Sequence, residues 1–377
     1  VASAVPAHAS PLPDDCNPKG NAPNDKPLWQ QQRLQFKRAW PFSMGQGIKV
    51  AVVDTGVSTQ NPQLRADSIV TGGVDLVHDN EHHPPYEVDC KLGHGTPVAG
   101  IIAARPTSGT HFVGVAPRSQ ILSVRYASGL EDEAPIARLA KGIRWAVGHG
   151  AQVINVSSTA TTQYSKLREA IEYAEQQDVV VVAATGNDGA QGNPVTYPAA
   201  FPSVIAVGAI DKTGAVVGFS DTAVQASVVA PGQGVVSTLP KTGHKTDNGT
   251  SFAAPFVAGA AALVRAAYPD LSATQVRHRI EATADHVGGD LPDPKYGWGV
   301  VDPYAAVTTI LPEENGEPTR TPEAAGPLPP VHLPPPPDHT ARDTALQITG
   351  VGFAVVVLLL AGLATFRRGR ARGWRPG

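Results

Sequence analysis

The 377-residue sequence predicts an α/β fold, with a largely parallel sheet and helices on both faces, followed by one C-terminal transmembrane helix. Short continuous apolar runs, typical of buried strands, indicate the sheet, and amphipathic segments between them indicate the covering helices. The membrane helix is indicated by residues 348–366, which contain no charged residue and are long enough to span hydrocarbon.

The expected strands contain almost only apolar residues. They occupy residues 48–53, 121–126, 153–156, 179–184 and 204–210. Runs this short and apolar are typical of parallel strands that are buried between two layers of helices.

One covering helix follows from periodicity. Its apolar stripe, at helical spacing, consists of Ile136, Leu139, Ala140, Ile143 and Val147. Gly148 and Gly150 follow and predict the end of this helix.

The composition is that of a globular protein, with 42% hydrophobic and 17% charged residues. The formal net charge is −3, but five arginines lie after residue 366, and removing these five positive charges leaves −8 on the rest of the chain. An acidic body without a basic stripe argues against a nucleic-acid-binding protein.

The two cysteines, Cys16 and Cys90, are too few for a four-cysteine zinc site and too far apart for a CxxC redox pair. In an exported protein we expect them to form one disulfide, worth about 4 kcal/mol by loop-entropy arithmetic. The alternative is that Cys90, four residues before His94, is a reactive thiol, which would need a reducing compartment.

The N-terminal residues favour an exported protein. Ala7-His8-Ala9 has the small-x-small pattern that precedes a signal-peptidase cut, so residues 1–9 are interpreted as a signal-peptide remnant. Residues 10–46 then form an extension ahead of the first core strand.

The C-terminal part predicts a membrane anchor. A buried core helix is the alternative for residues 348–366, but such a helix would rarely be uncharged all round and followed by an arginine-rich tail at 367–377. That tail predicts a cytoplasmic C-terminus, with the body on the extracytoplasmic, periplasmic side of the cell membrane. Residues 312–347 are proline-rich and are expected to be an extended linker, although a PxxP ligand is the alternative.

Two candidate catalytic residues lie next to predicted strands and tight turns. Asp54 ends a strand, and functional sites in open α/β sheets gather at the carboxyl ends of strands. An aspartate that caps the next turn is the structural alternative. His94 lies between two glycines that allow close approach of the backbone, and a small-residue helix is expected after it.

A third candidate is Ser251, which follows a glycine turn and opens a helix of alanine, valine and leucine. A helix N-cap would explain this serine alone. Hydroxyl, imidazole and carboxylate together suffice for acyl transfer, with Ser251 as nucleophile, His94 as general base and acid, and Asp54 orienting the imidazole.

A fourth element is a strand that ends in a Gly-Asn turn. The Asn187 side chain is expected to donate a hydrogen bond to an oxyanion, with the Ser251 main-chain N–H as the second donor. The structural alternative for Asn187 is a turn-forming asparagine, and one asparagine can both form the turn and donate to an oxyanion.

Four segments resemble the subtilisin family of serine proteases. They read VVDTGV around Asp54, GHGTPVAGIIAA around His94, AATGNDG around Asn187 and NGTSFAAPFVAG around Ser251, and occur in the subtilisin order of Asp, His and Ser. The resemblance extends over about residues 47–307 and implies a subtilisin-like protease domain, which we place at 47–311.

The sequence departs from the subtilisin pattern in two places. The substrate strand after Asn155 reads Val-Ser-Ser-Thr, with Ser157 and Ser158 as expected substrate-binding residues, so the family's pocket preferences cannot be transferred. Substrate docking along an edge strand is expected to survive. The N-terminal extension is too short for a folded inhibitory propeptide, so we expect it to wrap permanently around the body without activation cleavage.

The order of extension, protease body, proline-rich linker and membrane helix resembles the mycosins, subtilisin-like proteases of mycobacterial type VII secretion systems. This resemblance implies a polypeptide substrate and association with the secretion membrane complex. It also leaves open a second role as a structural, stabilising subunit of that complex. We expect no cofactor and no catalytic metal, and assign no structural calcium site.

Overall fold

The computed structural model describes residues 27–65, 69–77, 93–128, 136–287, 289–315, 340–371 and 373. The chain divides into two compact units, Val1–Pro318 and Thr319–Gly377, and each is described by itself.

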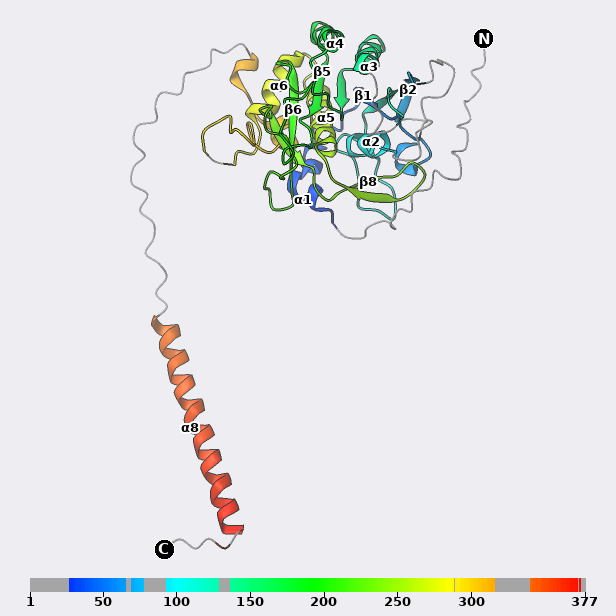
Figure 1. Ribbon diagram of the computed structural model, residues 1–377. Coiled ribbons are helices and arrows are strands. Elements are labelled where there is room, and N and C mark those ends of the chain that lie inside the picture. The colour runs from blue at the N-terminus through cyan, green and yellow to red at the C-terminus, as the bar shows by residue number, and fades with distance from the viewer. Residues whose placement is uncertain are drawn as a thin grey trace, which may run out of the picture. The chain divides into compact units, whose positions relative to one another are not determined.

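A seven-stranded parallel sheet forms the centre of the first unit, in the order β2-β3-β1-β4-β5-β6-β7 (Figure 1). The strands are β1 (Lys49–Asp54), β2 (Val70–Asp75), β3 (Gln120–Arg125), β4 (Val153–Val156), β5 (Val180–Ala184), β6 (Val204–Ile210) and β7 (Val228–Pro231). Five of these match the strands predicted from apolar runs to within a residue at each end. The predicted subtilisin-like α/β fold is confirmed.

Helices cover both faces of the sheet, as the strand sequences require. Along β1, Val50 and Val52 enter one apolar core, whereas Ala51 and Val53 enter the other. The first core is closed by α2 (Gly95–Ala103), α5 (Thr250–Ala267) and α6 (Ala273–Ala282), and the second by α3 (Ile136–Gly148) and α4 (Ser165–Gln176). Figure 1 shows α3 and α4 together on one side.

The strand order reverses at β1, which pairs with β3 on one side and with β4 on the other. The carboxyl ends of strands at such a switch point form a natural crevice for ligands. Asp54 is the last residue of β1 and therefore lies at this crevice.

A hairpin of β8 (Val235–Thr238) and β9 (His244–Asp247) packs on the first turn of α2. The Ser237 hydroxyl donates to the Pro97 carbonyl over 2.7 Å, and the Thr238 hydroxyl donates to the Thr96 carbonyl over 3.1 Å. These bonds satisfy carbonyls on the turn that directly follows His94.

The described part of the N-terminal extension lies against the body. It contains α1 (Trp29–Leu34) and a 3₁₀ turn (Phe36–Ala39), and its apolar residues Leu34 and Phe36 join the first core. The Trp29 indole N–H donates to the Gly234 carbonyl over 3.0 Å, and the Gln30 amide donates to the Val236 carbonyl over 3.1 Å. The extension is therefore tied to the strand β8 and the loop before it.

The C-terminal end of the body is held by a buried ion pair. After α7 (Pro303–Thr308), a 3₁₀ turn (Pro312–Asn315) brings Glu314 to the Arg279 guanidinium. Arg279 also donates to the Ala306 carbonyl over 2.9 Å. Residues 1–26, including the predicted signal-peptide remnant 1–9 and Cys16, lie outside the described residues, as do Cys90 and residues 316–339 of the predicted linker 312–347.

The second unit contains α8 (Thr340–Ala371), which includes the predicted membrane helix 348–366. Its apolar stretch Thr349–Ala371 has no residue buried inside the protein, whereas α5, which is also long and apolar, is 89% buried. By this contrast α5 is a core helix, whereas the long apolar stretch of α8 is exposed.

Candidate active site

The three predicted catalytic residues lie together at the carboxyl edge of the sheet. His94 Nδ1 lies 2.9 Å from both carboxylate oxygens of Asp54, and His94 Nε2 lies 3.1 Å from Ser251 Oγ. All three are nearly buried, with exposed fractions of 4% for Asp54, 2% for His94 and 7% for Ser251. The geometry forms one hydrogen-bonded chain from carboxylate to imidazole to hydroxyl.

A glycine makes the first of these contacts possible. Gly95 begins α2 directly after His94, and a Cβ at Gly95 would lie 2.2 Å from the Gly56 carbonyl oxygen. The Gly95 N–H also donates to the Thr55 hydroxyl over 3.0 Å. The start of α2 therefore lies directly against the turn after β1, and this contact brings the His94 imidazole to Asp54.

Ser251 is the second residue of α5, and the helix begins after Gly249, whose φ is +147°. A Cβ at Gly249 would lie 2.9 Å from Ser251 Oγ and 3.5 Å from Asn187 Nδ2. The Ser251 hydroxyl and the Asn187 amide nitrogen thus face the same small space, which a side chain at Gly249 would fill.

Asn187 follows the carboxyl end of β5 and is exposed. Its Oδ1 accepts hydrogen bonds from the Thr250 main-chain N–H at 2.9 Å and from the Thr250 hydroxyl at 3.1 Å. Because these bonds fix Oδ1 toward Thr250, the Nδ2 donor is turned toward the space beside Ser251 Oγ. This is the orientation that an oxyanion donor needs.

The two predicted substrate-binding serines have partners within the protein. The Ser157 hydroxyl accepts from Asn155 Nδ2 at 2.8 Å and donates to the Ser251 main-chain carbonyl at 2.9 Å. The Ser158 hydroxyl is 2.5 Å from the Tyr126 hydroxyl, which donates to it. Burial raises the pKa of Tyr126 to about 12, so that phenol remains a proton donor throughout the ordinary pH range.

Sequence reasoning missed three contacts of this site. Ser157 acts on the backbone of Ser251, Thr250 orients Asn187, and the Phe252 ring packs on His94 with 5.1 Å between ring centroids. Phe252 directly follows Ser251 in the helix motif, so the sequence could have indicated that its ring lies near the site. Nothing in the spacing indicates the other two contacts.

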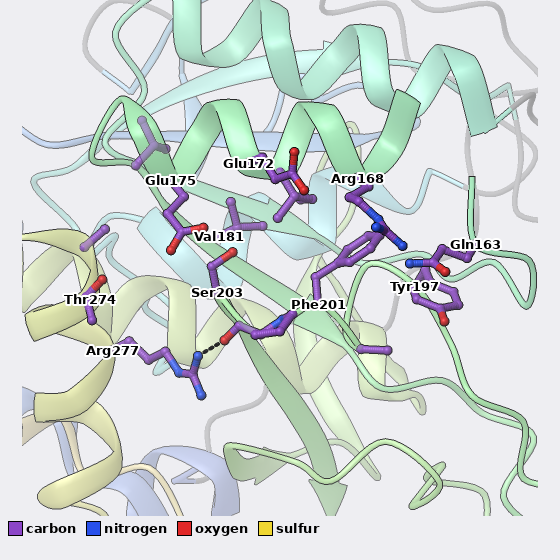
Figure 2. A pocket seen from close by; sticks show the side chains of 15 residues that line it. Gln163, Arg168, Glu172, Glu175, Val181, Tyr197, Phe201, Ser203, Thr274 and Arg277 are labelled. Atoms are coloured by element: carbon purple, nitrogen blue, oxygen red, sulfur yellow. Dashed lines mark hydrogen bonds between the residues drawn. The ribbon is translucent and has the colours of Figure 1, made fainter. Parts of the chain in front are cut away.

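A pocket of about 550 Å³ lies elsewhere, between α4 and α6. Figure 2 shows Glu172 and Glu175 pointing into it from α4, and Arg277 from α6 donating to the Pro202 carbonyl. None of the three candidate catalytic side chains lines this pocket. Among the described residues, no group of three or more His, Cys, Asp or Glu side chains could hold a metal ion.

Comparisons with known proteins agree with this geometry. The model of the subtilase family matches residues 45–299. Subtilisin DY from Bacillus licheniformis is 38% identical over 264 residues, which is 70% of this chain and 91% of that protein. The chain therefore belongs to the subtilase family and is a subtilisin-like serine endopeptidase.

Two solved structures resemble the chain over more of its length. MycP1 from Mycobacterium smegmatis matches with a TM-score of 0.65 and 31% identity, covering 82% of this chain and 93% of that one. The MycP3 protease from the type VII (ESX-3) secretion system matches with a TM-score of 0.65 and 31% identity, covering 77% and 92%. The predicted resemblance to mycosins is confirmed, and the chain is related to these proteases of type VII secretion.

Proposed function

We propose that this protein is a membrane-anchored endopeptidase that cuts exported polypeptides beside a type VII secretion system, with Asp54, His94 and Ser251 as its catalytic triad. The observation that carries the proposal is the continuous set of contacts, at 2.9 and 3.1 Å, from Asp54 through His94 to Ser251 Oγ. These are the distances over which a nucleophile, its base and an orienting carboxylate work together.

In the proposed reaction, Ser251 Oγ attacks the carbonyl carbon of the scissile peptide and passes its proton to His94 Nε2. Asp54 holds the imidazole in the tautomer that has its proton on Nδ1 and stabilises the imidazolium that forms. His94 then gives the proton to the leaving amine, and a water molecule repeats the sequence on the acyl-enzyme. The carbonyl oxygen, negative in each tetrahedral intermediate, accepts hydrogen bonds from Asn187 Nδ2 and the Ser251 N–H.

The substrate strand is proposed to run along residues 157–158. The side chain of Ser157 is occupied by Asn155 and Ser251, so its contribution to substrate would come from its main chain. Ser158 is half-buried, and its hydroxyl is fixed by Tyr126. Main-chain pairing with an extended peptide is compatible with both arrangements.

The helix α8 is proposed to span the membrane, with the protease unit outside the cytoplasm. Support comes from its long apolar surface and from Arg367, Arg368 and Arg370 at its end, which by the positive-inside rule favour a cytoplasmic C-terminus. Association with a secretion system is proposed because the structural relatives MycP1 and MycP3 are described as proteases of type VII systems.

The proposed disulfide between Cys16 and Cys90 would fasten the extension at a second place, beyond the contacts of Trp29 and Gln30. Peptide mapping without reduction should recover one cross-linked pair. Two free thiols in protein purified from an oxidising compartment would reject this pairing.

Fluorophosphonate labelling of the detergent-solubilised full chain tests the proposed activity. We expect a single adduct on Ser251, mapped by mass spectrometry, and none in Ser251→Ala. An adduct that persists in Ser251→Ala would place the nucleophile elsewhere. No adduct on correctly folded wild-type protein would favour a structural subunit of the secretion complex instead.

A further inference from the structure

Asp221 packs against the turn that carries Asn187. The Asp221 main-chain N–H donates to the Gly186 carbonyl over 3.0 Å, and the Gly189 N–H donates to the Phe219 carbonyl over 2.9 Å. These two bonds dock the turn 186–189 on the segment 219–221. The Asp221 side chain is enclosed at this junction.

The Asp221 carboxyl touches the residue just before Asn187. A Cβ at Gly186, whose φ is +116°, would lie 2.0 Å from Asp221 Oδ2. Because consecutive Cα atoms are about 3.8 Å apart, this oxygen lies within about 7 Å of the Asn187 Cα. The carboxyl is thus a close neighbour of the proposed oxyanion donor.

This carboxyl is buried and poorly satisfied. Asp221 is 1% exposed, and neither carboxylate oxygen makes a hydrogen bond of regular geometry among the described residues. Burial, and then the negative charge of Asp188, raise the pKa of Asp221 to about 6, and the nearby Asp188 N–H offsets part of that rise. Thr196, whose methyl group also lies against Gly186, is uncharged.

We propose that Asp221 is a proton-controlled positioning residue of the oxyanion hole, neutral when protonated and opposing the developing oxyanion when ionised. The inference rests on the proposed role of Asn187. Since the site is buried, a charge there is poorly screened by solvent and acts strongly on a second charge nearby. The substrate carbonyl oxygen becomes negative only as the reaction proceeds, so the effect falls on kcat and spares KM.

The test compares Asp221→Asn with wild type at each pH from 5 to 9, which cancels ionisations that both enzymes share. We expect equal kcat values near pH 5 and an increase of about three- to tenfold in the variant above pH 7, with a midpoint near 6 and unchanged KM. Asp221→Ser, which is neutral and smaller, should give the same pH dependence and guards against a folding defect in either variant.

Asp188→Asn is the matched control, because Asp188 is an exposed carboxylate on the same turn. Any effect of this exposed charge should vanish in 1 M NaCl, where the Debye length is about 3 Å, whereas that of Asp221 should persist. The proposal would be overturned if the ratio of kcat in Asp221→Asn to kcat in wild type did not change with pH, or if it changed with salt concentration.

Unfolding in the Ser251→Ala background gives a readout that is independent of hydrolysis. The stability advantage of Asp221→Asn should grow as pH rises from about 4 to about 6 and then level off. An absence of this step would also overturn the proposal. If the wild-type enzyme neither reacts with fluorophosphonate nor hydrolyses peptides, the proposed function is rejected. If both enzymes are active but the ratio of their kcat values does not change with pH, only this inference is rejected.

Discussion

The Ser157 hydroxyl donates a 2.9 Å hydrogen bond to the main-chain carbonyl of Ser251, so the serine that follows β4 holds the backbone of the proposed nucleophile. Asn155 in turn donates to the Ser157 oxygen over 2.8 Å. This links the end of β4 to the first turn of α5.

Ser157→Ala should lower kcat more than it changes KM, because the backbone of Ser251 loses a positional restraint while the cleft keeps its shape. We expect a fall of about three- to tenfold and a loss of about 1–2 kcal/mol of unfolding free energy, since Asn155 Nδ2 is left buried without an acceptor. Steady-state kinetics and urea unfolding measure the two effects. Ser158→Ala is the control, and an equal fall in kcat there would argue against the specific link.

Asn187→Ala should reduce kcat by about 10²–10³ with little change in KM, the size found on removing an oxyanion-hole asparagine from subtilisin. The matched variant is Thr250→Val, which removes one of the two bonds that orient Asn187 but leaves the amide in place. We expect it to lose activity by a smaller factor. Equal effects on kcat and KM in Asn187→Ala would argue against an oxyanion role.

Gly95→Ala should nearly abolish activity, because the added methyl would lie 2.2 Å from the Gly56 carbonyl and force His94 away from Asp54. Fluorophosphonate labelling rates and circular dichroism separate lost activity from lost folding. Gly148→Ala, at the end of α3 with nothing within 4 Å of the new methyl, should keep full activity. A fully active Gly95→Ala would mean that the site tolerates a displaced histidine helix.

His244 should make the β8–β9 hairpin sensitive to acid. Burial lowers the pKa of His244, so the folded protein resists protonation that the unfolded chain accepts at about pH 6.5. The stabilising contribution is therefore present above that pH and is lost as pH falls below it. In the Ser251→Ala background, His244→Gln should unfold with a weaker dependence on pH below about 6.5, and an unchanged dependence would contradict this account.

Truncation after Asn315 should release a soluble protease unit. The buried ion pair of Arg279 and Glu314 remains in such a chain, so the C-terminal end of the body stays fixed while α8 is lost. Glu314→Ala in the truncated chain should cost about 3–5 kcal/mol, because Arg279 is left buried without its carboxylate. Gel filtration without detergent checks the first expectation, and persistent detergent dependence would mean that another surface binds membrane.

Much of the fold could be predicted because it depends on local signals, whereas the candidate triad was indicated by four motifs in the order that subtilisins have. Apolar runs predict β1, β4 and β6. The glycines on both sides of His94 and shortly before Ser251 indicate places where the backbone comes close to another segment. Contacts between residues far apart in the chain leave no such signal. The bond between Ser157 and Ser251 spans 94 positions, and the burial of Asp221 against Gly186 depends on how two loops pack. The sequence alone therefore suggested Ser157 for substrate and passed over Asp221.

The hairpin β8–β9 supports two segments at once, with α1 bound near Gly234 and Val236 and the first turn of α2 bound at Ser237 and Thr238. Segments that share a support in this way tend to open together as one cooperative unit. Amide hydrogens in the turn after His94 should then exchange with solvent on the same timescale as those of α1. The proposed catalytic base and the helix α1 would thus belong to a single unfolding event, although they are some sixty residues apart in sequence.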